Sequence, residues 1–558
     1  MKNRSIITLL LLMFTLGAVL VGCNFDDSAD EVDSDTTTED GTESESEGVD
    51  TETGTEQVLN LSENSEIPTM DSVHAHDGVS FTALTNTTEG LYRLGVEHDA
   101  VLAIADDHQP SEDGLVHTFT LRDANWSNGE PVTADDFVYG WQRIFEDTGH
   151  YANMFETAKI LNATEILNGE KSADELGVEA IDEKTLEVTL SGPNPLLAQN
   201  LTFPSFLPQN QEFVESQGDQ YALEASNLLF NGPFIMSEWK HDQSWQYKKN
   251  PDYWDAEAVK LEEINVFVVK ESSTELNLYE TNELDRVELS ASSVDQYQDD
   301  ENFSLVDDAE IRFLRFNHNL EDLGNENIRR AIDLGWDKVA HADVILNNGS
   351  KPLYGLVPEG FSTSPDDTDF RDLNGAFNQG NYEEAQAFLD EGLKEIGKDS
   401  TTISIMSSDD ESMMKTAEYL KDQLETNLSG LTVEINVVPF EQRLELEKSI
   451  EYGISISSWG PDYIDPMTYL GMWVTEGSAN RMGYSNPEFD ALIDEINNEQ
   501  DPAARYEMML EAEKLLFEDA AIGPAYQVTN AVLQRTNIKD LAYHPSGAEF
   551  TFKWAYIE

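Results

Sequence analysis

Cysteine is almost absent from this 558-residue chain, in which Cys23 is the only one. A single thiol cannot form an internal disulfide, so disulfide-stapled folds are excluded and Cys23 needs another explanation. It follows an apolar run, residues 6–21, which is preceded by Lys2 and Arg4. A short basic region followed by an apolar run too short for a comfortable membrane span is typical of a secretory signal peptide. We therefore predict a signal peptide over residues 1–22.

The end of that segment, "LVGC", resembles a bacterial lipoprotein signal, in which the cysteine becomes the lipidated first residue. The alternative is an ordinary signal peptide with an incidental cysteine. Residues 24–57 contain no Lys or Arg and are rich in Asp, Glu, Ser and Thr, so they cannot bury enough apolar surface to fold. We predict that residues 23–57 form an acidic disordered tether, lipidated at Cys23. The protein would then be extracytoplasmic and anchored by lipid to the outer face of the cell membrane.

Basic residues are also scarce: 33 Lys and Arg stand against 109 Asp and Glu, a formal net charge of −76. Nucleic-acid binding needs a basic surface, so this balance argues against it. The acidity could attract cationic ligands through a long-range field. It could instead adapt an exported surface to high salt or high pH. The even spread of acidic residues along the chain favours the second interpretation.

That interpretation predicts a salt dependence of stability. At low ionic strength, self-repulsion destabilises the folded part, and added salt relieves it by shortening the screening length. We expect the melting temperature to rise between dilute buffer and about 1 M salt. A melting temperature that does not change over this range would contradict the prediction.

Sequence motifs for catalysis and metal binding are missing as well. The chain has no H-E-x-x-H, G-x-S-x-G, P-loop or G-x-G-x-x-G motif and no paired-cysteine motif. The nearest metal candidate is "HAHD", where His74 and His76 could share one face of a strand and Asp77 could join them. No further histidine cluster nearby would complete that site. Carboxylates are so frequent that their proximity in sequence says little about acid–base catalysis. We expect no enzyme activity, no cofactor and no metal.

The roughly 500 residues after the tether exceed a single hydrophobic core and should divide into two or three lobes. Residues 185–190 ("TLEVTL") and 262–269 ("EEINVFVV") have the pattern of strands. Residues 381–397 and 501–519 have helical periodicity, the second with Asp501 as its N-cap. This alternation indicates a mixed α/β fold.

Residues 117–143, "HTFTLRDANWSNGEPVTADDFVYGWQR", indicate a strand, a turn at Asn128-Gly129 and a helix capped by Thr133. This segment resembles the signature of extracytoplasmic oligopeptide-binding proteins of ABC importers (solute-binding protein family 5, the peptide/nickel-binding family). Further segments match in the same order: 176–190, 231–239, 250–255, 327–338, 458–466 and 483–493. The resemblance covers residue 58 to the C-terminus. Related members take dipeptides, nickel complexes, haem or oligosaccharides.

The resemblance implies a two-lobed, periplasmic-binding-protein-like α/β clamp with an extra inserted domain and a ligand between the lobes. Carried over to this chain, lobe I comprises residues 58–88, 209–310 and 528–558, the inserted domain residues 89–208, and lobe II residues 311–527.

The resemblance also implies a binding role for "SWGPDYIDP", residues 458–466. In peptide-binding relatives, the aspartate matched by Asp462 takes the ammonium of the ligand's N-terminus. A carboxylate in a water-excluded cleft can recognise this charge through charge-assisted hydrogen bonds. The backbone of Trp459 and Gly460 could pair with an extended ligand like an added strand, with Tyr463 beside it. The alternative makes Asp462 a turn residue bonded to its own backbone.

On the opposite lobe, the resemblance implies a backbone strip at Asp77, Gly78 and Val79, where Gly78 permits close approach of the ligand's main chain. Tyr151 matches an aromatic residue that faces the ligand, and Tyr526 lies near a comparable position. Each of these aromatics could instead be a core residue, and Trp459 is either a pocket wall or a packing residue.

The sequence departs from the best-studied oligopeptide binders where they hold the ligand's C-terminus. Ile456 replaces an arginine, and Ser412 stands near the position of a histidine. Arg443, Lys448 or Arg481 could substitute, and the preferred peptide length stays open.

We therefore predict a monomeric receptor that captures oligopeptides and delivers them to an ABC permease, with no chemical step. The alternatives are a receptor of the same fold for another solute, a peptide-signal receptor or, less in keeping with the motifs, an exported hydrolase.

Overall fold

The computed structural model describes residues 55–558 except 148, 478, 500 and 546. The predicted signal peptide, Cys23 and nearly all of the tether lie outside the described residues. Across the described part of the chain, no helix is both long enough and apolar enough to cross a membrane.

The first four-stranded sheet has the order β1-β10-β9-β8. Its strand β1 (Val58–Glu63) runs parallel to β10 (Glu263–Val268), and β9 (Ser244–Lys249) and β8 (Phe234–Lys240) continue the sheet in antiparallel fashion. The strand predicted over residues 262–269 is therefore confirmed as β10. Helix α1 (Gly78–Thr87) buries its apolar side chains in the core that this sheet covers.

The second four-stranded sheet is antiparallel, with the order β4-β5-β7-β6. Its strands are β4 (Ala105–Pro110), β5 (Val116–Leu121), β7 (Thr185–Thr189) and β6 (Val178–Asp182). Helix α2 (Ala134–Glu146) follows a turn in which Gly129 has φ +88°, and Thr133 is its N-cap as predicted. The carboxylate of Asp136 accepts from the backbone N–H of Thr133 at 2.8 Å, which closes a capping box. Both four-stranded sheets share one core, and we call this region the two-sheet part.

A seven-stranded sheet has the order β11-β17-β12-β16-β14-β15, with β13 paired to β17. Its two longest strands, β12 (Phe303–Phe316) and β17 (Ile522–Gln534), pair antiparallel. Their register breaks between Asp307 and Ile311. The other strands are β11 (Arg286–Glu288), β13 (Lys351–Pro352), β14 (Thr401–Ser408), β15 (Leu431–Val438) and β16 (Ile454–Trp459).

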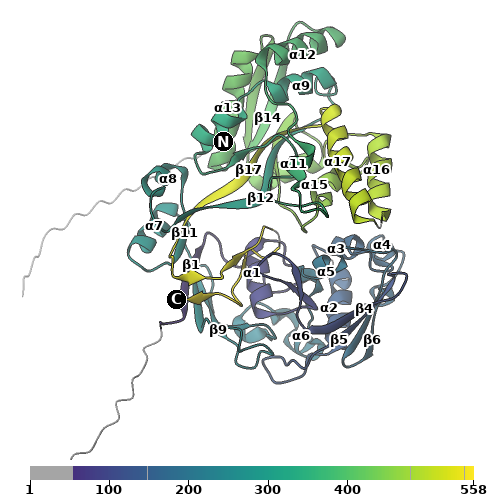
Figure 1. The fold of residues 1–558 in the computed structure, drawn as a ribbon, viewed down its shortest axis with the longest axis vertical. Coiled ribbons are helices and arrows are strands. Elements are labelled where there is room, and N and C mark those ends of the chain that lie inside the picture. The colour runs from purple at the N-terminus through teal and green to yellow at the C-terminus, as the bar shows by residue number, and fades with distance from the viewer. Residues whose placement is uncertain (1–54, 148, 478, 500, 546) are drawn as a thin grey trace, which may run out of the picture. The chain divides into compact units, whose positions relative to one another are not determined.

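Helices pack against both faces of this sheet, because the neighbouring β12 residues Phe313 and Leu314 belong to two different hydrophobic cores. In Figure 1 these helices are drawn above the sheet and to its left and right. They include α9 (Glu326–Leu334), α12 (Tyr382–Glu395), α13 (Glu411–Asn427), α16 (Pro487–Asn498) and α17 (Pro502–Glu518). The helices predicted over residues 381–397 and 501–519 are confirmed as α12 and α17. Asp501 caps α17, because its carboxylate accepts from the N–H groups of Ala503 (3.0 Å) and Ala504 (2.9 Å). We call this region the seven-stranded part; it has hydrophobic cores of its own.

Short helices fill the connections: α3 (Asn153–Thr157), α4 (Ala163–Leu167), α5 (Leu197–Asn200), α6 (Gln211–Gln217), α7 (Ser272–Glu280), α8 (Ala291–Tyr297), α10 (Lys338–Ala340), α11 (Phe370–Asn374), α14 (Phe440–Lys448) and α15 (Met467–Leu470). Short two-stranded pairings, β2 (Tyr92–Leu94) with β3 (Ala100–Leu102), β18 (Ile538–Lys539) with β21 (Tyr556–Ile557) and β19 (Ala542–Tyr543) with β20 (Phe550–Thr551), complete the two-sheet part.

Candidate functional site

Two adjoining cavities lie where the two-sheet part meets the seven-stranded part. The first, of about 360 Å³, is lined from the start of α1, from Tyr151, from the turn after β16 and from residues 543–545, 547 and 549. The second, of about 580 Å³, is lined by residues 97–99 of the two-sheet part and by residues 307–309 and 359–363 of the seven-stranded part. Both share Asp308, Tyr543 and Pro545, so they adjoin each other, and each has a size typical of ligand sites.

The structure brings five of the nine predicted ligand-binding residues to the first cavity. These residues are Asp77, Gly78, Tyr151, Gly460 and Asp462, and they come from segments hundreds of residues apart. Val79, Trp459, Tyr463 and Tyr526 do not line it.

Asp462 is positioned by the turn that ends β16 at Trp459. Its backbone N–H donates to the hydroxyl of Thr468 at 3.1 Å, which holds the turn in place. Among the described residues, its half-buried carboxylate has neither a hydrogen-bond donor nor a cation, so the local turn bond considered above does not form. Burial raises the pKa of Asp462 to about 6, because no charge or donor compensates for its lost hydration.

The predicted backbone strip at residues 77–79 lies at the start of a helix. Gly78 and Val79 form the first turn of α1, and Asp77 is its N-cap, accepting from the N–H of Ser80 at 2.8 Å. The other carboxylate oxygen of Asp77 is buried without a partner in the described chain. Gly78 faces open space, whereas Val79 packs against the core of the two-sheet part.

The predicted aromatic residues divide into two groups. Tyr151 contacts Phe81 and Phe203, with ring centroids at 5.6 and 4.9 Å. Burial, and then the negative charges of Asp462 and Asp77, raise the pKa of Tyr151 to about 12, so its hydroxyl stays protonated in the cavity.

The other three aromatics serve mainly to pack the seven-stranded part. Tyr526 is 3% exposed in its core, with its ring centroid 5.4 Å from that of His341, so the structure favours the packing interpretation. The indole nitrogen of Trp459 lies 3.4 Å from the hydroxyl of Thr468. Tyr463 packs against the same core as Trp459 and, with Asp462, lines a narrow neighbouring pocket.

None of the three basic residues considered for the ligand's C-terminus lines either cavity. Arg443 is 2% exposed and forms an ion pair with Glu447 at 2.6 Å. Lys448 is exposed, and Arg481 is half-buried. Ile456 is a core residue, and the hydroxyl of Ser412 donates to Asp410 at 2.7 Å.

The "HAHD" segment is not a strand: His74 lies in a turn, and α1 begins directly after Asp77. No group of three His, Cys, Asp or Glu residues in the described part of the chain is arranged to hold a metal ion.

Carboxylates dominate the lining of the two cavities. Nine line them: Asp77, Glu97, Asp99, Glu288, Asp307, Asp308, Glu359, Asp462 and Glu549. No Lys or Arg of the described chain is among the lining residues. Sequence reasoning found only Asp77 and Asp462, because the others lie in segments whose convergence has no local signal.

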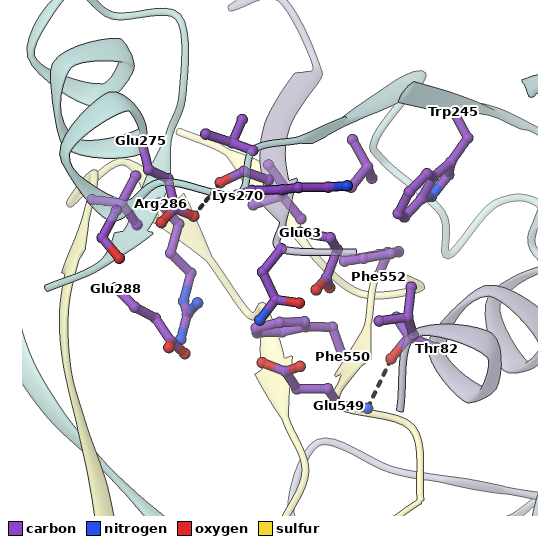
Figure 2. A pocket seen from close by; sticks show the side chains of 18 of the residues that line it. Glu63, Thr82, Trp245, Lys270, Glu275, Arg286, Glu288, Glu549, Phe550 and Phe552 are labelled. Carbon is purple, nitrogen blue, oxygen red and sulfur yellow. Dashed lines mark hydrogen bonds between the residues drawn. The ribbon is translucent and has the colours of Figure 1, made fainter. Parts of the chain in front are cut away.

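A third cavity, of about 210 Å³, lies in the two-sheet part beside β1, β9, β10 and β11. Figure 2 shows Glu63, Arg286, Glu288 and Glu549 around it, with Phe550 and Phe552 along one side. It shares Glu288 and Glu549 with the first cavity.

Known proteins resemble this chain over nearly all of its described length. The model for "Bacterial extracellular solute-binding proteins, family 5 Middle" matches residues 99–481. The dipeptide-binding protein DppE of Bacillus subtilis is 34% identical, over 90% of this chain and 92% of its own length. The oligopeptide-binding protein OppA of the same organism is 29% identical over the full length of both.

Solved structures agree with this match. The peptide-bound OppA of Listeria monocytogenes is 41% identical and superposes with a TM-score of 0.77, over 90% of this chain and 99% of that one. The substrate-binding domain of an oligopeptide ABC transporter from Bacillus anthracis is 40% identical and superposes with a TM-score of 0.78, over 90% of this chain and 99% of that one. The predicted two-lobed α/β clamp is thereby confirmed. The chain belongs to family 5 of the bacterial extracellular solute-binding proteins.

Proposed function

We propose that this chain is the extracytoplasmic receptor of an ABC importer, which captures oligopeptides between its lobes and delivers them to a membrane permease. The observation that carries the proposal is the carboxylate of Asp462, which lines the cavity between the lobes without any partner among the described residues. The α-ammonium is the positive charge common to unmodified peptides, and a carboxylate in a largely dehydrated site binds it through charge-assisted hydrogen bonds.

The geometry of the first cavity supports this assignment. Asp77 and Tyr151 line it together with Asp462, so an ammonium could reach more than one acceptor residue. A site that reads the ammonium and the main chain reads few side chains, which permits many peptide sequences. Binding across both lobes stabilises the closed clamp, and the proposal contains no chemical step.

The predicted division into lobes is part of the proposal. Its cuts at residues 310/311 and 527/528 fall within β12 and β17, at the break in their register. The core shared by the two four-stranded sheets supports placing the inserted domain, residues 89–208, on lobe I. We also propose a monomer that is anchored through lipid on Cys23 and the acidic tether.

The experiment that tests the function is mass spectrometry of ligands that co-purify with residues 58–558, released by denaturation. A ladder of mixed short peptides is the expected result. A single peptide would indicate a dedicated signal receptor on the same scaffold. A haem, a metal chelate or a sugar would overturn the peptide assignment.

The pKa of Asp462 predicts a pH dependence of binding. This pKa is raised to about 6 in the free protein, so the carboxylate is ionised above that pH and progressively neutral below it. A peptide ammonium binds the ionised form, so affinity should fall as the pH is lowered through 6. Between pH 7.5 and pH 5 we expect about a tenfold loss for a peptide with uncharged side chains, measured by isothermal titration calorimetry. The Asp462→Asn variant should show no such dependence. If both proteins showed the same pH dependence, a titrating group other than Asp462 would be responsible for it.

A further inference from the structure

Most of the carboxylates that line the two cavities lack a partner among the residues that the structure describes. Asp307 forms an ion pair with Lys351 at 2.6 Å. Asp308 accepts from the hydroxyl of Tyr543 and from the N–H of Glu310, both at 2.9 Å. A peptide ammonium near Asp462 and Asp77 would account for two more. Five remain: Glu97, Asp99, Glu288, Glu359 and Glu549. None of these five side chains has an ion pair or a hydrogen bond with the described part of the chain.

Two of the three histidines that line the cavities, His98 and His544, do not supply the missing positive charge; the third, His76, is exposed and lines the first cavity. The Nδ1 atoms of His98 and His544 lie 3.0 Å apart, an arrangement that two protonated rings would disfavour. Burial lowers the pKa of both, for His544 to about 3, so these rings are neutral at pH 7.

Two cations, Arg286 and Lys270, line the third cavity together with Glu288 and Glu549 (Figure 2), and Arg286 is only 8% exposed. Its guanidinium lies over the ring of Phe550, 4.8 Å from the centroid, and forms no ion pair with a described carboxylate. Burial raises the pKa of Glu549 to about 7 despite the opposing influence of Arg286. Among the described residues, the carboxylate of Glu549 therefore has no ion-pair partner.

The acidity of the whole chain does not account for this lining. At the overall ratio of 33 basic to 109 acidic residues, nine carboxylates would be accompanied by about three basic residues. The two cavities have none among the described residues.

We propose, resting on the function proposed above, that these cavities select peptides with cationic side chains after the first residue. When the peptide's ammonium binds Asp462, the side chains of the next peptide residues reach Glu288 and Glu549 in the first cavity. Those of later residues reach Glu97, Asp99 and Glu359 in the second cavity. Lysine or arginine side chains supply donors to these carboxylates, whereas neutral ones leave them unpaired and acidic ones add repulsion. The C-terminal carboxylate meets no cation in either cavity, so amidation of the peptide does not weaken binding.

The test compares pentapeptides with arginine at positions 2 and 4 with the same peptides carrying citrulline, which keeps the shape and loses the charge. By isothermal titration calorimetry at pH 7.5 and moderate salt, we expect citrulline to weaken binding at least tenfold. In the double variant Glu288→Gln/Glu549→Gln this discrimination should shrink several-fold, while affinity for an all-alanine pentapeptide stays within about twofold.

A matched control removes two charges elsewhere: Glu179→Gln/Glu301→Gln, at exposed positions that line neither cavity. This control should keep the full preference for arginine over citrulline. If the control variant lost that preference, the effect would be due to the net charge of the protein and not to the cavity. Equal affinity of wild-type protein for arginine and citrulline peptides would overturn the inference while the peptide function stands. Failure of all these peptides, the all-alanine one included, to bind would count against the proposed function itself. Melting temperatures of the variants distinguish lost folding from lost preference.

Discussion

Replacing Asp462 by asparagine should weaken the binding of an unmodified peptide by about 2–5 kcal/mol, which is roughly 30- to 5000-fold. The substitution keeps the size of the side chain and removes the only charge that it places in the cavity. The ligand ammonium would then be dehydrated without a counter-charge at that position, and this is what makes the loss large. Stability should not fall, because the carboxylate makes no hydrogen bond or ion pair with other described residues.

Acetylation of the peptide's N-terminus provides a second arm of the same experiment. It should weaken binding to the wild-type protein by a similar factor and should have little further effect on the asparagine variant, as a double-mutant cycle requires for interacting groups. Asp366→Asn, at an exposed position that lines neither cavity, is the matched control and should bind like the wild type. Unchanged affinity in Asp462→Asn would refute the ammonium assignment.

Replacing Glu513 by alanine should destabilise the seven-stranded part by about 3–5 kcal/mol, the range for removing one partner of a buried charge pair. Glu513 lies in α17 and is fully buried, and its carboxylate accepts from the backbone N–H groups of Leu356 (2.7 Å) and Val357 (3.1 Å). It also accepts from Asn374 at 2.6 Å and forms an ion pair with Arg371. Alanine would leave four donors, one of them charged, without their acceptor.

Urea denaturation, followed by hydrogen–deuterium exchange of peptides from the seven-stranded part, measures this loss. Glu511→Ala is the control on the same helix, because Glu511 is exposed and pairs only with Lys514, at 3.2 Å. Exposed ion pairs of this kind contribute little to the free energy of unfolding, so the control should unfold at the same urea concentration as the wild type. Glu513→Gln should fall between the two, since its amide oxygen still accepts from the backbone while the charge for Arg371 is lost. Equal stability of the two alanine variants would show that the buried network adds nothing.

Local chemistry was enough to predict several elements from the sequence. Thr133 and Asp501 were expected to cap helices and do so, because capping depends only on the next three residues. Strand β7 follows from the alternation of "TLEVT", in which Leu186 and Val188 are buried. The resemblance to a family supplied the clamp and Asp462, which local patterns alone would not have distinguished from a turn residue.

What the sequence did not reveal has equally physical origins. The helix at residues 78–87 has one local sign, Asp77, whose carboxylate caps the N–H of Ser80, and this sign alone does not exclude an irregular ligand-facing segment. Tyr526 could not be separated from a pocket residue, because nearly every position of β17 is buried and alternation carries no information there. Glu288 and Glu549 meet across 260 residues of chain, and no local pattern predicts such a meeting.

The break in register between β12 and β17 has a mechanical consequence. From Asp307 to Ile311, three residues of β12 stand opposite Val528 alone, and a second register shift follows between Arg312 and Phe313. A hydrogen-bonded ribbon resists bending where its ladder is complete and yields where it is interrupted, so we expect flexion between the two lobes to concentrate from Asp307 to Phe313. The backbone oxygen of Ala309 accepts from Tyr469, and the carboxylate of Asp308 accepts from Tyr543. Asp308 also lines both cavities, so the interrupted stretch of the ladder lies beside the space in which we propose that the peptide binds.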